Sequence, residues 1–235
     1  MRPGAVMIFS AGFGTRMRPL THTRPKPLIE VAGRTLIDRA LDLADDAGIS
    51  RKVINTHYLG AQLADHLAGR SDVCLSPEVG KPLETGGGLK RALPFLDGDC
   101  VFTLNPDAVW TGPNPLIALA SAWEPRRMDA LLMLVPLARA TGHEGAGDFQ
   151  CAPDGRVSRL DRAAKEPRVY TGAQIIKTDR VAKHADTRFS LHRIWEEMDA
   201  EGRVFGIIHP GGWADVGTPG GIATAETLLR ENGDV

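Results

Sequence analysis

Residues 6–21 have the sequence VMIFSAGFGTRMRPLT, which joins an apolar run to a glycine-rich loop. The run Val6–Phe9 is typical of a buried strand in a parallel sheet, whose carboxyl end opens into a loop. Glycines directly after such a strand let backbone N–H groups approach a phosphate closely. The stretch therefore predicts an α/β fold whose first loop binds a phosphate-bearing ligand.

Strand and helix patterns alternate beyond this loop. Thr35 is suited to cap a helix that begins at Leu36, and Gly48 is suited to end it. Further predicted strands are Lys52–Asn55, Asp72–Leu75, Cys100–Leu104 and Ala130–Val135, and further predicted helices are Leu59–Leu67, Leu89–Leu96 and Pro115–Ala122. Such alternation favours right-handed crossovers, and therefore a doubly wound, mostly parallel, Rossmann-like sheet.

The segments become shorter after Pro136. Phe149–Ala152 and Val157–Leu160 flank a Pro-Asp-Gly turn and predict a hairpin in a small β-rich sub-sheet. The sequence also predicts strands at Val169–Ile176 and Val204–Ile208, a helix capped by Ser190 that runs to Met198, and a helix capped by Thr218 that runs to Arg230. No linker or repeat interrupts the chain, so we expect one domain over residues 1–235, with halves at about 1–136 and 137–235 that share a cleft.

Composition excludes several classes of protein. The 28 basic side chains nearly balance the 29 acidic ones, so no global field would hold nucleic acid or an anionic membrane surface. No apolar stretch approaches the ~20 residues of a membrane-spanning helix. The three cysteines show no zinc-site spacing and indicate a reduced compartment. We expect a cytoplasmic enzyme without nucleic-acid or membrane partners.

The phosphate-binding interpretation is stronger than its two rivals. A dinucleotide fingerprint needs a third glycine where Met17 stands, and no Gly-Lys-Ser/Thr string of a Walker A loop occurs in the chain. Arg16, Arg18 and Lys26 lie within one proline-rich loop and can balance the charge of a polyphosphate. The loop therefore predicts a triphosphate site.

This loop, with RPKPL at residues 24–28, resembles the signature of the sugar-1-phosphate nucleotidyltransferases. The resemblance implies a GT-A-like fold with a nucleotide-binding half at 1–136 and a sugar-binding half at 137–235. It also implies that Arg16 and Lys26 are catalytic and neutralise the reacting phosphates. The residues of this loop expected to bind the nucleotide are Ala11, Gly12, Gly14, Thr15, Arg16 and Lys26.

A second motif is ETGGG at residues 84–88, which we expect to form a glycine-rich loop before a helix that starts near Leu89. In the resembled family a segment of this kind holds the base and ribose, so Thr85, Gly86 and Gly87 are expected to bind the nucleotide. The motif is similar to the form found in the branch that uridylylates muramic acid 1-phosphate in peptidoglycan recycling.

Two aspartates are candidate metal ligands. Asp107 follows the predicted strand Cys100–Leu104, and an acidic residue there faces the crevice in which doubly wound sheets bind ligands. Asp215 lies in WADVGTP, residues 213–219, which resembles a late motif of the family. The resemblance implies that Asp107 and Asp215 converge to hold Mg²⁺ and that Asp107 is catalytic. Pro106 stands where the family usually has glycine or serine.

Acceptor-binding residues are expected mainly in the second half. The resemblance points to Asn105, Gly147, Asp148, Thr171 and Gly172 as substrate-binding residues. Lys165, in an altered version of the family's Glu-Lys-Pro string, is a further candidate for the sugar phosphate. The histidines, including His57, His143 and His192, form no ligand spacing and are interpreted as structural or surface residues.

The implied reaction joins a nucleoside triphosphate to a sugar 1-phosphate and releases pyrophosphate. We expect UTP and N-acetylmuramic acid 1-phosphate as substrates, in a monomer or small homo-oligomer. A mannose-1-phosphate guanylyltransferase that uses GTP is the first alternative, and a non-catalytic nucleotide-sugar-sensing module is the second. A cytidylyltransferase for phosphocholine would favour an aromatic cage, and none of the four tryptophans is clustered with another in sequence.

Overall fold

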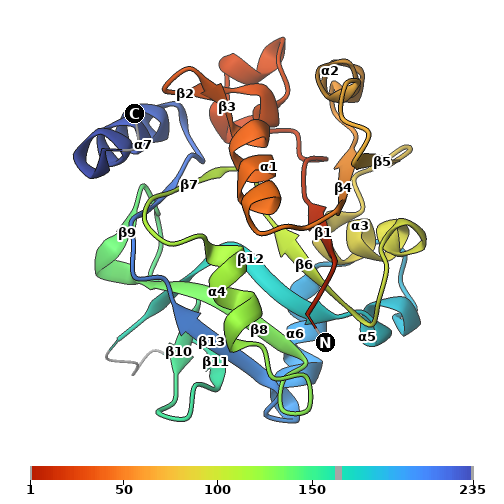
Figure 1. The fold of residues 1–235 in the computed structure, drawn as a ribbon, viewed down its shortest axis with the longest axis vertical. Helices are drawn as coiled ribbons and strands as arrows, with labels where there is room; N and C mark the ends of the chain where they lie inside the picture. The colour runs from red at the N-terminus through yellow and green to blue at the C-terminus, as the bar shows by residue number, and fades with distance from the viewer. Residues whose placement is uncertain (1, 162–165, 234–235) are drawn as a thin grey trace.

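The computed structural model describes residues 2–161 and 166–233, and over these residues the chain forms a mixed sheet with helices on both faces (Figure 1). The main sheet has the order β11-β10-β12-β6-β1-β4-β5; β8 also pairs with β12, and β13 pairs with β8. Its strands are β1 Ala5–Ile8, β4 Arg51–Thr56, β5 Val73–Pro77, β6 Cys100–Leu104, β8 Ala130–Pro136, β10 Phe149–Cys151, β11 Val157–Arg159, β12 Arg168–Lys177 and β13 Val204–Ile208. Strands β5, β4, β1 and β6 run parallel, whereas β12 is antiparallel to β6 and β8. The predicted doubly wound α/β architecture is confirmed.

Two smaller sheets complete the strands. One consists of β7 Ala108–Trp110, β14 Trp213–Asp215 and β9 Ala140–Thr141, and the other of β2 Glu30–Val31 and β3 Arg34–Thr35. The helices are α1 Leu36–Asp46, α2 Gly60–Leu67, α3 Glu84–Ala92, α4 Pro115–Ala122, α5 Asp179–Lys183, α6 Leu191–Ala200 and α7 Pro219–Asn232, with short 3-10 turns at Thr15–Met17, Leu20–His22, Lys26–Leu28, Leu93–Phe95 and Leu137–Arg139. The part of the chain that the structure describes contains no helix long and apolar enough to cross a membrane.

Local sequence signals fix several helix ends. The Thr35 hydroxyl accepts a hydrogen bond from the Asp38 N–H at the start of α1, and the Ser190 hydroxyl accepts one from the His192 N–H at the start of α6. Gly48 follows α1 with a φ of +67°, which glycine adopts without strain. These predicted caps are confirmed. Thr218 precedes α7 as predicted, but its side chain makes no capping hydrogen bond there.

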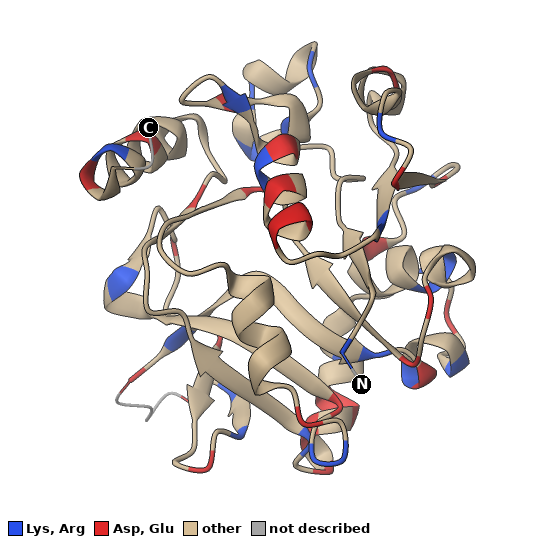
Figure 2. Ribbon diagram, in the orientation of Figure 1, with Lys and Arg blue, Asp and Glu red and all other residues tan. Residues whose placement is uncertain are grey.

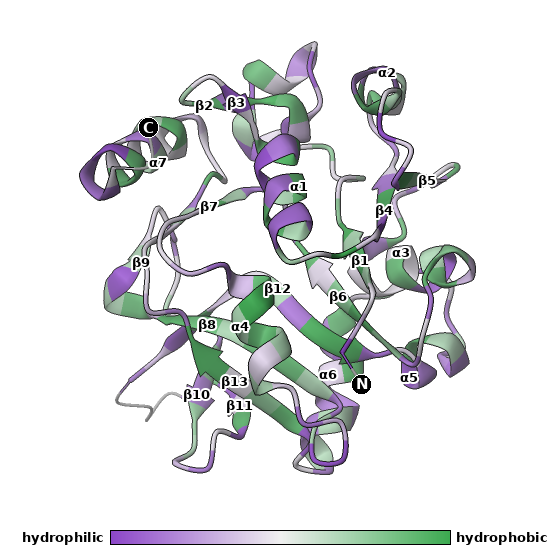
Figure 3. Cartoon of the chain, viewed as in Figure 1, coloured by the Kyte–Doolittle hydropathy of each residue, from purple (hydrophilic) through white to green (hydrophobic). Residues whose placement is uncertain are grey.

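The core lies on both faces of the main sheet. Val6 and Ile8 of β1 pack into the cluster shared with α1 and α4, whereas Ala5 and Met7 pack into the opposite cluster with α3 and α6. All four side chains are fully buried, and the central strands are correspondingly hydrophobic (Figure 3). Because both faces are covered, a continuous apolar run rather than an alternating one encodes this strand.

The predicted hairpin is present as β10 and β11, and it continues the main sheet through a bridge between Phe149 and Arg168 of β12. The helix predicted at Leu89–Leu96 begins five residues earlier, at Glu84, so that prediction was wrong at its start. The glycines of ETGGG lie inside α3, where tertiary packing overrides their low helix propensity.

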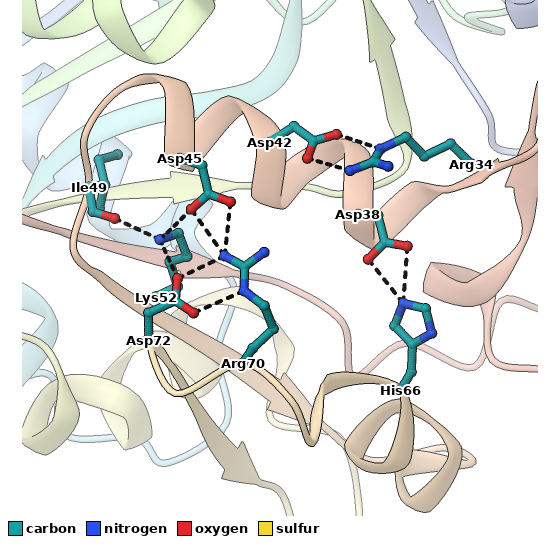
Figure 4. A network of polar contacts seen from close by, with 9 residues as sticks. All are labelled: Arg34, Asp38, Asp42, Asp45, Ile49, Lys52, His66, Arg70 and Asp72. Carbon is teal, nitrogen blue, oxygen red and sulfur yellow. Dashed lines mark hydrogen bonds and ion pairs between the residues drawn. The ribbon is translucent and has the colours of Figure 1, made fainter.

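Charged residues are sparse in the central strands of the main sheet, and acidic residues recur along α1 (Figure 2). One cluster surrounds a buried lysine: the Lys52 Nζ lies 2.7 Å from Asp45, 2.6 Å from Asp72 and 2.8 Å from the Ile49 carbonyl oxygen, while both carboxylates are partly exposed (Figure 4). Arg70 bonds both carboxylates and, with Lys52, holds the pKa of Asp72 below its usual range. These bonds tie α1 to β4 and to the start of β5, at the end of the sheet away from the glycine-rich loop.

Candidate active site

The glycine-rich loop leaves the carboxyl end of β1 and turns back over it. Gly14 has a φ of +60°, and a Cβ there would lie 2.9 Å from Thr21 Cγ2, so glycine is required at this position. The Thr21 hydroxyl donates to the Gly14 carbonyl oxygen over 2.8 Å and closes the loop. Gly12, Thr15 and Arg16 are exposed, whereas Ala11 is buried. The loop thus presents backbone groups and a guanidinium to solvent.

The three-stranded sheet of β7, β14 and β9 brings the two predicted metal ligands, Asp107 and Asp215, together. Strand β14 pairs antiparallel with β7, which places Asp215 opposite Ala108, and the Val216 N–H donates to the Asp107 carbonyl oxygen over 2.8 Å. Burial, and then the negative charge of Asp107, raises the pKa of Asp215 above its ordinary value. Two carboxylates separated by more than a hundred residues therefore meet closely enough to repel each other.

Basic side chains complete this cluster. The Lys26 Nζ lies 2.7 Å from Asp107 Oδ2, and the lysine side chain is largely buried. A Cβ on Gly217 would lie 2.8 Å from Asp215 Oδ2 and 2.9 Å from Arg16 Nη1. The Arg16 guanidinium and the Asp215 carboxylate therefore both lie beside Gly217. The structure therefore brings together the side chains of Arg16, Lys26, Asp107 and Asp215, as expected from sequence.

The chemistry of these donors fits a magnesium ion that a substrate helps to bind. Mg²⁺ is commonly held by one or two carboxylates together with water and substrate phosphates, not by a full protein cage. Within residues 2–161 and 166–233, no group of three or more histidine, cysteine or acidic side chains is placed to hold a metal. Asp107 and Asp215 supply two carboxylates whose mutual repulsion a divalent cation would relieve.

A cavity of about 240 Å³ opens beside the cluster, between the glycine-rich loop and the start of α3. Phe9, Ala11, Gly12, Asn55, Glu78, Pro82, Glu84, Thr85, Asn105 and Asp107 line it. A smaller cavity of about 100 Å³ shares Phe9, Gly12 and Asp107 with it and reaches Gly14 and Lys26. The two cavities share these lining residues and together form a hollow that reaches from Lys26 and Asp107 to Asn55 at the end of β4.

Sequence reasoning missed two polar residues of this hollow, Asn55 and Glu78. Asn55 Oδ1 accepts the Ser10 N–H over 2.6 Å, and its amide nitrogen donates to Glu78 Oε1 over 2.7 Å. Glu78 is only 6% exposed, and its other carboxylate oxygen accepts the Leu83 N–H. Both residues lie at or just beyond the carboxyl ends of parallel strands, which is the signal that could have found them.

Glu84 and Thr85 of the ETGGG motif line the cavity, whereas its three glycines do not. Thr85 lines the cavity, and its hydroxyl oxygen accepts the Leu191 N–H over 3.0 Å. The N–H groups of Gly86 and Gly87 both donate to the Phe189 carbonyl oxygen. A Cβ at either glycine would lie 2.4 Å or less from this neighbouring segment. The geometry therefore gives no support to the expected contact of Gly86 and Gly87 with a nucleotide, because close packing explains both glycines.

On the acceptor side, Asn105 lines the cavity and its N–H donates to the Gly172 carbonyl oxygen. Gly172 has a φ of +89°, and a Cβ there would lie 2.7 Å from the Asn105 Cβ. Thr171 is 2% exposed and its hydroxyl donates to the Met133 carbonyl oxygen, so this side chain faces the core and not a ligand. Of the acceptor candidates, Asn105 lines the cavity, and Gly172 packs directly against Asn105.

The remaining acceptor candidates lie beside the start of β12. Asp148 accepts the Tyr170 N–H over 2.8 Å, and a Cβ on Gly147 would lie 2.8 Å from the Pro167 Cβ. Neither residue lines the cavities described above. Asp148 and Gly147 thus contact the start of β12 and the residue before it. The further candidate Lys165 lies outside the described residues.

The MobA-like NTP transferase domain matches residues 6–179 of this chain. The chain belongs to this family. The matched region contains the glycine-rich loop, Lys26 and Asp107, while Asp215 lies beyond its end. Membership makes the protein a nucleotidyltransferase.

Relatives and solved structures agree with this assignment. The chain is 40% identical to the N-acetylmuramate alpha-1-phosphate uridylyltransferase of Caulobacter vibrioides, over 97% of this chain and 98% of the relative. It is 36% identical to the enzyme of the same name from Neisseria meningitidis, over 94% and 96%. Mannose-1-phosphate guanylyltransferases match at 27% identity or less. The inositol-1-phosphate CTP transferase structure from T. maritima shares the fold, with a TM-score of 0.76, 16% identity and 97% coverage of both chains.

Proposed function

We propose that this nucleotidyltransferase joins UTP to N-acetylmuramic acid 1-phosphate, forming the UDP-sugar and pyrophosphate. The observation that carries the proposal is the meeting of Arg16, Lys26, Asp107 and Asp215 beside the glycine-rich loop, where Lys26 and Asp107 also line the adjoining cavities. The choice of substrates is supported by relatives at 40% and 36% identity that are named for this reaction. The guanylyltransferase alternative has only the more distant relatives in its favour.

The reaction needs no nucleophile from the protein. A phosphate oxygen of the sugar 1-phosphate forms a bond to the α-phosphorus of UTP, while the bond between that phosphorus and the β-phosphate's bridging oxygen breaks. The attacking oxygen is already anionic, so the work of the site is alignment and charge neutralisation. Arg16 and Lys26 would stabilise the charge that grows on pyrophosphate as it leaves.

Asp107 and Asp215 would hold Mg²⁺, which when bound supplies positive charge against the phosphate oxygens of both substrates. Lys26 donates to Asp107 through one ammonium hydrogen and has two more for phosphate oxygens. We assign Asn105 to the acceptor sugar, because it lines the cavity beside Asp107 and is held against Gly172 at the end of β6. The buried pair Asn55 and Glu78 offers polar atoms at the far end of the hollow.

The test is pyrophosphate release with Mg²⁺, crossing UTP, GTP, CTP and dTTP against the 1-phosphates of N-acetylmuramic acid, mannose and glucose. We expect turnover with UTP and the muramic acid derivative, and a loss of at least about a hundredfold in kcat for Asp107→Asn. Asp97→Asn, an exposed aspartate distant from the site, is the matched control. Preferred turnover of GTP with mannose 1-phosphate would replace the proposal, and nucleotide binding without any turnover would favour the sensing module.

A further inference from the structure

The segment that joins β4 to α2 holds the glycine-rich loop by its backbone. The Tyr58 hydroxyl donates to the Thr21 carbonyl oxygen over 2.9 Å, and the His22 carbonyl oxygen lies 3.4 Å from the same hydroxyl. One helical turn further on, the side-chain amide of Gln62 donates to the Thr23 carbonyl oxygen over 2.9 Å. Three consecutive carbonyl groups of the loop therefore face polar side chains from one short segment.

Aromatic contacts join the same two parts of the chain. Phe13 stands between the first two glycines of the loop, and its ring packs against Tyr58 and His57 with centroids 5.7 Å and 5.3 Å apart. Leu59, the next residue after Tyr58, has a φ of +51°, which costs free energy for a residue with a side chain. Strained residues of this kind persist where their surroundings fix them. The segment that carries Tyr58 is thus held in one conformation.

Thr21 connects Tyr58 to the centre of the loop. Thr21 is 1% exposed, and its hydroxyl donates to the Gly14 carbonyl oxygen over 2.8 Å. The same carbonyl oxygen accepts the Met17 N–H over 2.9 Å, which closes the 3-10 turn around Arg16. A chain of hydrogen bonds therefore runs from the Tyr58 hydroxyl to the turn that carries the Arg16 guanidinium.

Tyr58 lies apart from the cavities in which we place the nucleotide. It lines neither the larger nor the smaller one, whereas Gly14 lines the smaller. Arg16, which we assign to the charge that grows on pyrophosphate, has an exposed side chain. A long exposed side chain has many rotamers, so the place that its guanidinium reaches depends on how firmly its backbone is held. The hydrogen bonds from Tyr58 supply that support.

We propose that Tyr58 is a positioning residue of the reaction. Through Thr21 it holds Gly14, and with it the turn that carries Arg16, where the triphosphate binds. This inference rests on the proposed function for the nature of the ligand. The Thr21 hydroxyl is the necessary link, because Tyr58 contacts the Thr21 backbone and the Thr21 side chain contacts Gly14. Loss of either hydroxyl therefore affects use of the nucleotide and not of the sugar 1-phosphate.

The experiment compares Tyr58→Phe, Thr21→Val and the double variant. Each single change removes one hydroxyl and keeps the shape of the side chain, including the ring of Tyr58 that packs on Phe13. We expect each to lower kcat/KM for UTP by about 2- to 10-fold, the range of one hydrogen bond between uncharged groups. The KM for N-acetylmuramic acid 1-phosphate should stay within about twofold of its native value.

The double variant tests whether Tyr58 acts through Thr21. Its loss in kcat/KM for UTP should not exceed the larger single loss, because residues of one hydrogen-bonded chain are coupled. Losses that multiply in the double variant would overturn the proposal, as would single variants with native kcat/KM for UTP. A merely structural role would lower the melting temperature and kcat, with both KM values unchanged, and this result would also overturn it.

Thr178→Val is the matched control. Its hydroxyl also donates to the carbonyl oxygen of a distant residue, Asp99, but at the end of β6 away from Asn105. This variant should keep the native kinetics. Equilibrium binding of UTP with Mg²⁺, without acceptor, is measured for all variants, and the Kd should rise up to about 10-fold for both single changes. This measurement tests Tyr58 even if the acceptor is not turned over. If the protein prefers another triphosphate, the same variants are measured with that one, so the choice of nucleotide and the role of Tyr58 are tested separately.

Discussion

Replacing Gly217 by alanine is the most direct perturbation of the charged cluster. The added methyl carbon would lie 2.8 Å from Asp215 Oδ2 and 2.9 Å from Arg16 Nη1, whereas ordinary van der Waals contact begins at 3.4 Å. The carboxylate and the guanidinium must therefore each retreat by about 0.5 Å. A misplacement of about 1 Å costs about a hundredfold in rate, so we expect kcat to fall about 10- to 100-fold.

Folding should be little affected, because both crowded atoms are the ends of flexible side chains and the backbone of Gly217 needs no positive φ. The assay is steady-state pyrophosphate release with UTP, combined with the thermal melting temperature of each variant. Gly220→Ala is the control, since the nearest atom to its methyl group lies 4.0 Å away. A Gly217→Ala protein that melts like the native protein and keeps kcat within twofold would refute the placement of Arg16 and Asp215 in the site.

Three further predictions concern other parts of the molecule. Lys26→Ala removes the partner 2.7 Å from Asp107 and should raise the KM for UTP and lower kcat in the same assay; unchanged kinetics would contradict the loop assignment. Gly87→Ala places a methyl 2.3 Å from the Thr187 carbonyl oxygen and should destabilise the fold by about 1–3 kcal/mol, seen by calorimetry as a melting temperature lower by roughly 2–10 °C. Burial lowers the pKa of His209, so the unfolded chain takes up a proton first and stability is lost as pH falls below about 6.5. His209→Gln should show a smaller drop in melting temperature between pH 7 and pH 5, and an equal drop would show that other groups control this range.

The parts of the fold that sequence predicted well are those with local signals. The apolar run of β1 is readable because both faces of the strand are buried, and Thr35 and Ser190 are readable because a hydroxyl at a helix start satisfies a free N–H. The glycine-rich loop after β1 was likewise predicted, because its glycines follow the strand directly in the chain.

The parts that escaped prediction depend on contacts between distant segments. The start of α3 at Glu84 follows from packing of its glycines against Phe189, a residue that no local pattern connects to it. The partnership of Asn55 with Glu78 forms only when β4 and β5 lie side by side. The resemblance predicts Thr171 as a ligand residue, but its hydroxyl donates to the Met133 carbonyl oxygen of β8, a contact between distant segments that the motif does not reveal.

The pairing of β14 with β7 also has a consequence for protein synthesis. Lys26 and Asp107 emerge from the ribosome early, whereas Asp215 comes from a strand that is translated about a hundred residues after Asp107. A nascent chain thus contains the glycine-rich loop, Lys26 and Asp107 well before Asp215 is translated. If Asp215 holds the metal as we propose, turnover requires the docked strand that carries it, and a partly translated chain would not consume nucleotide.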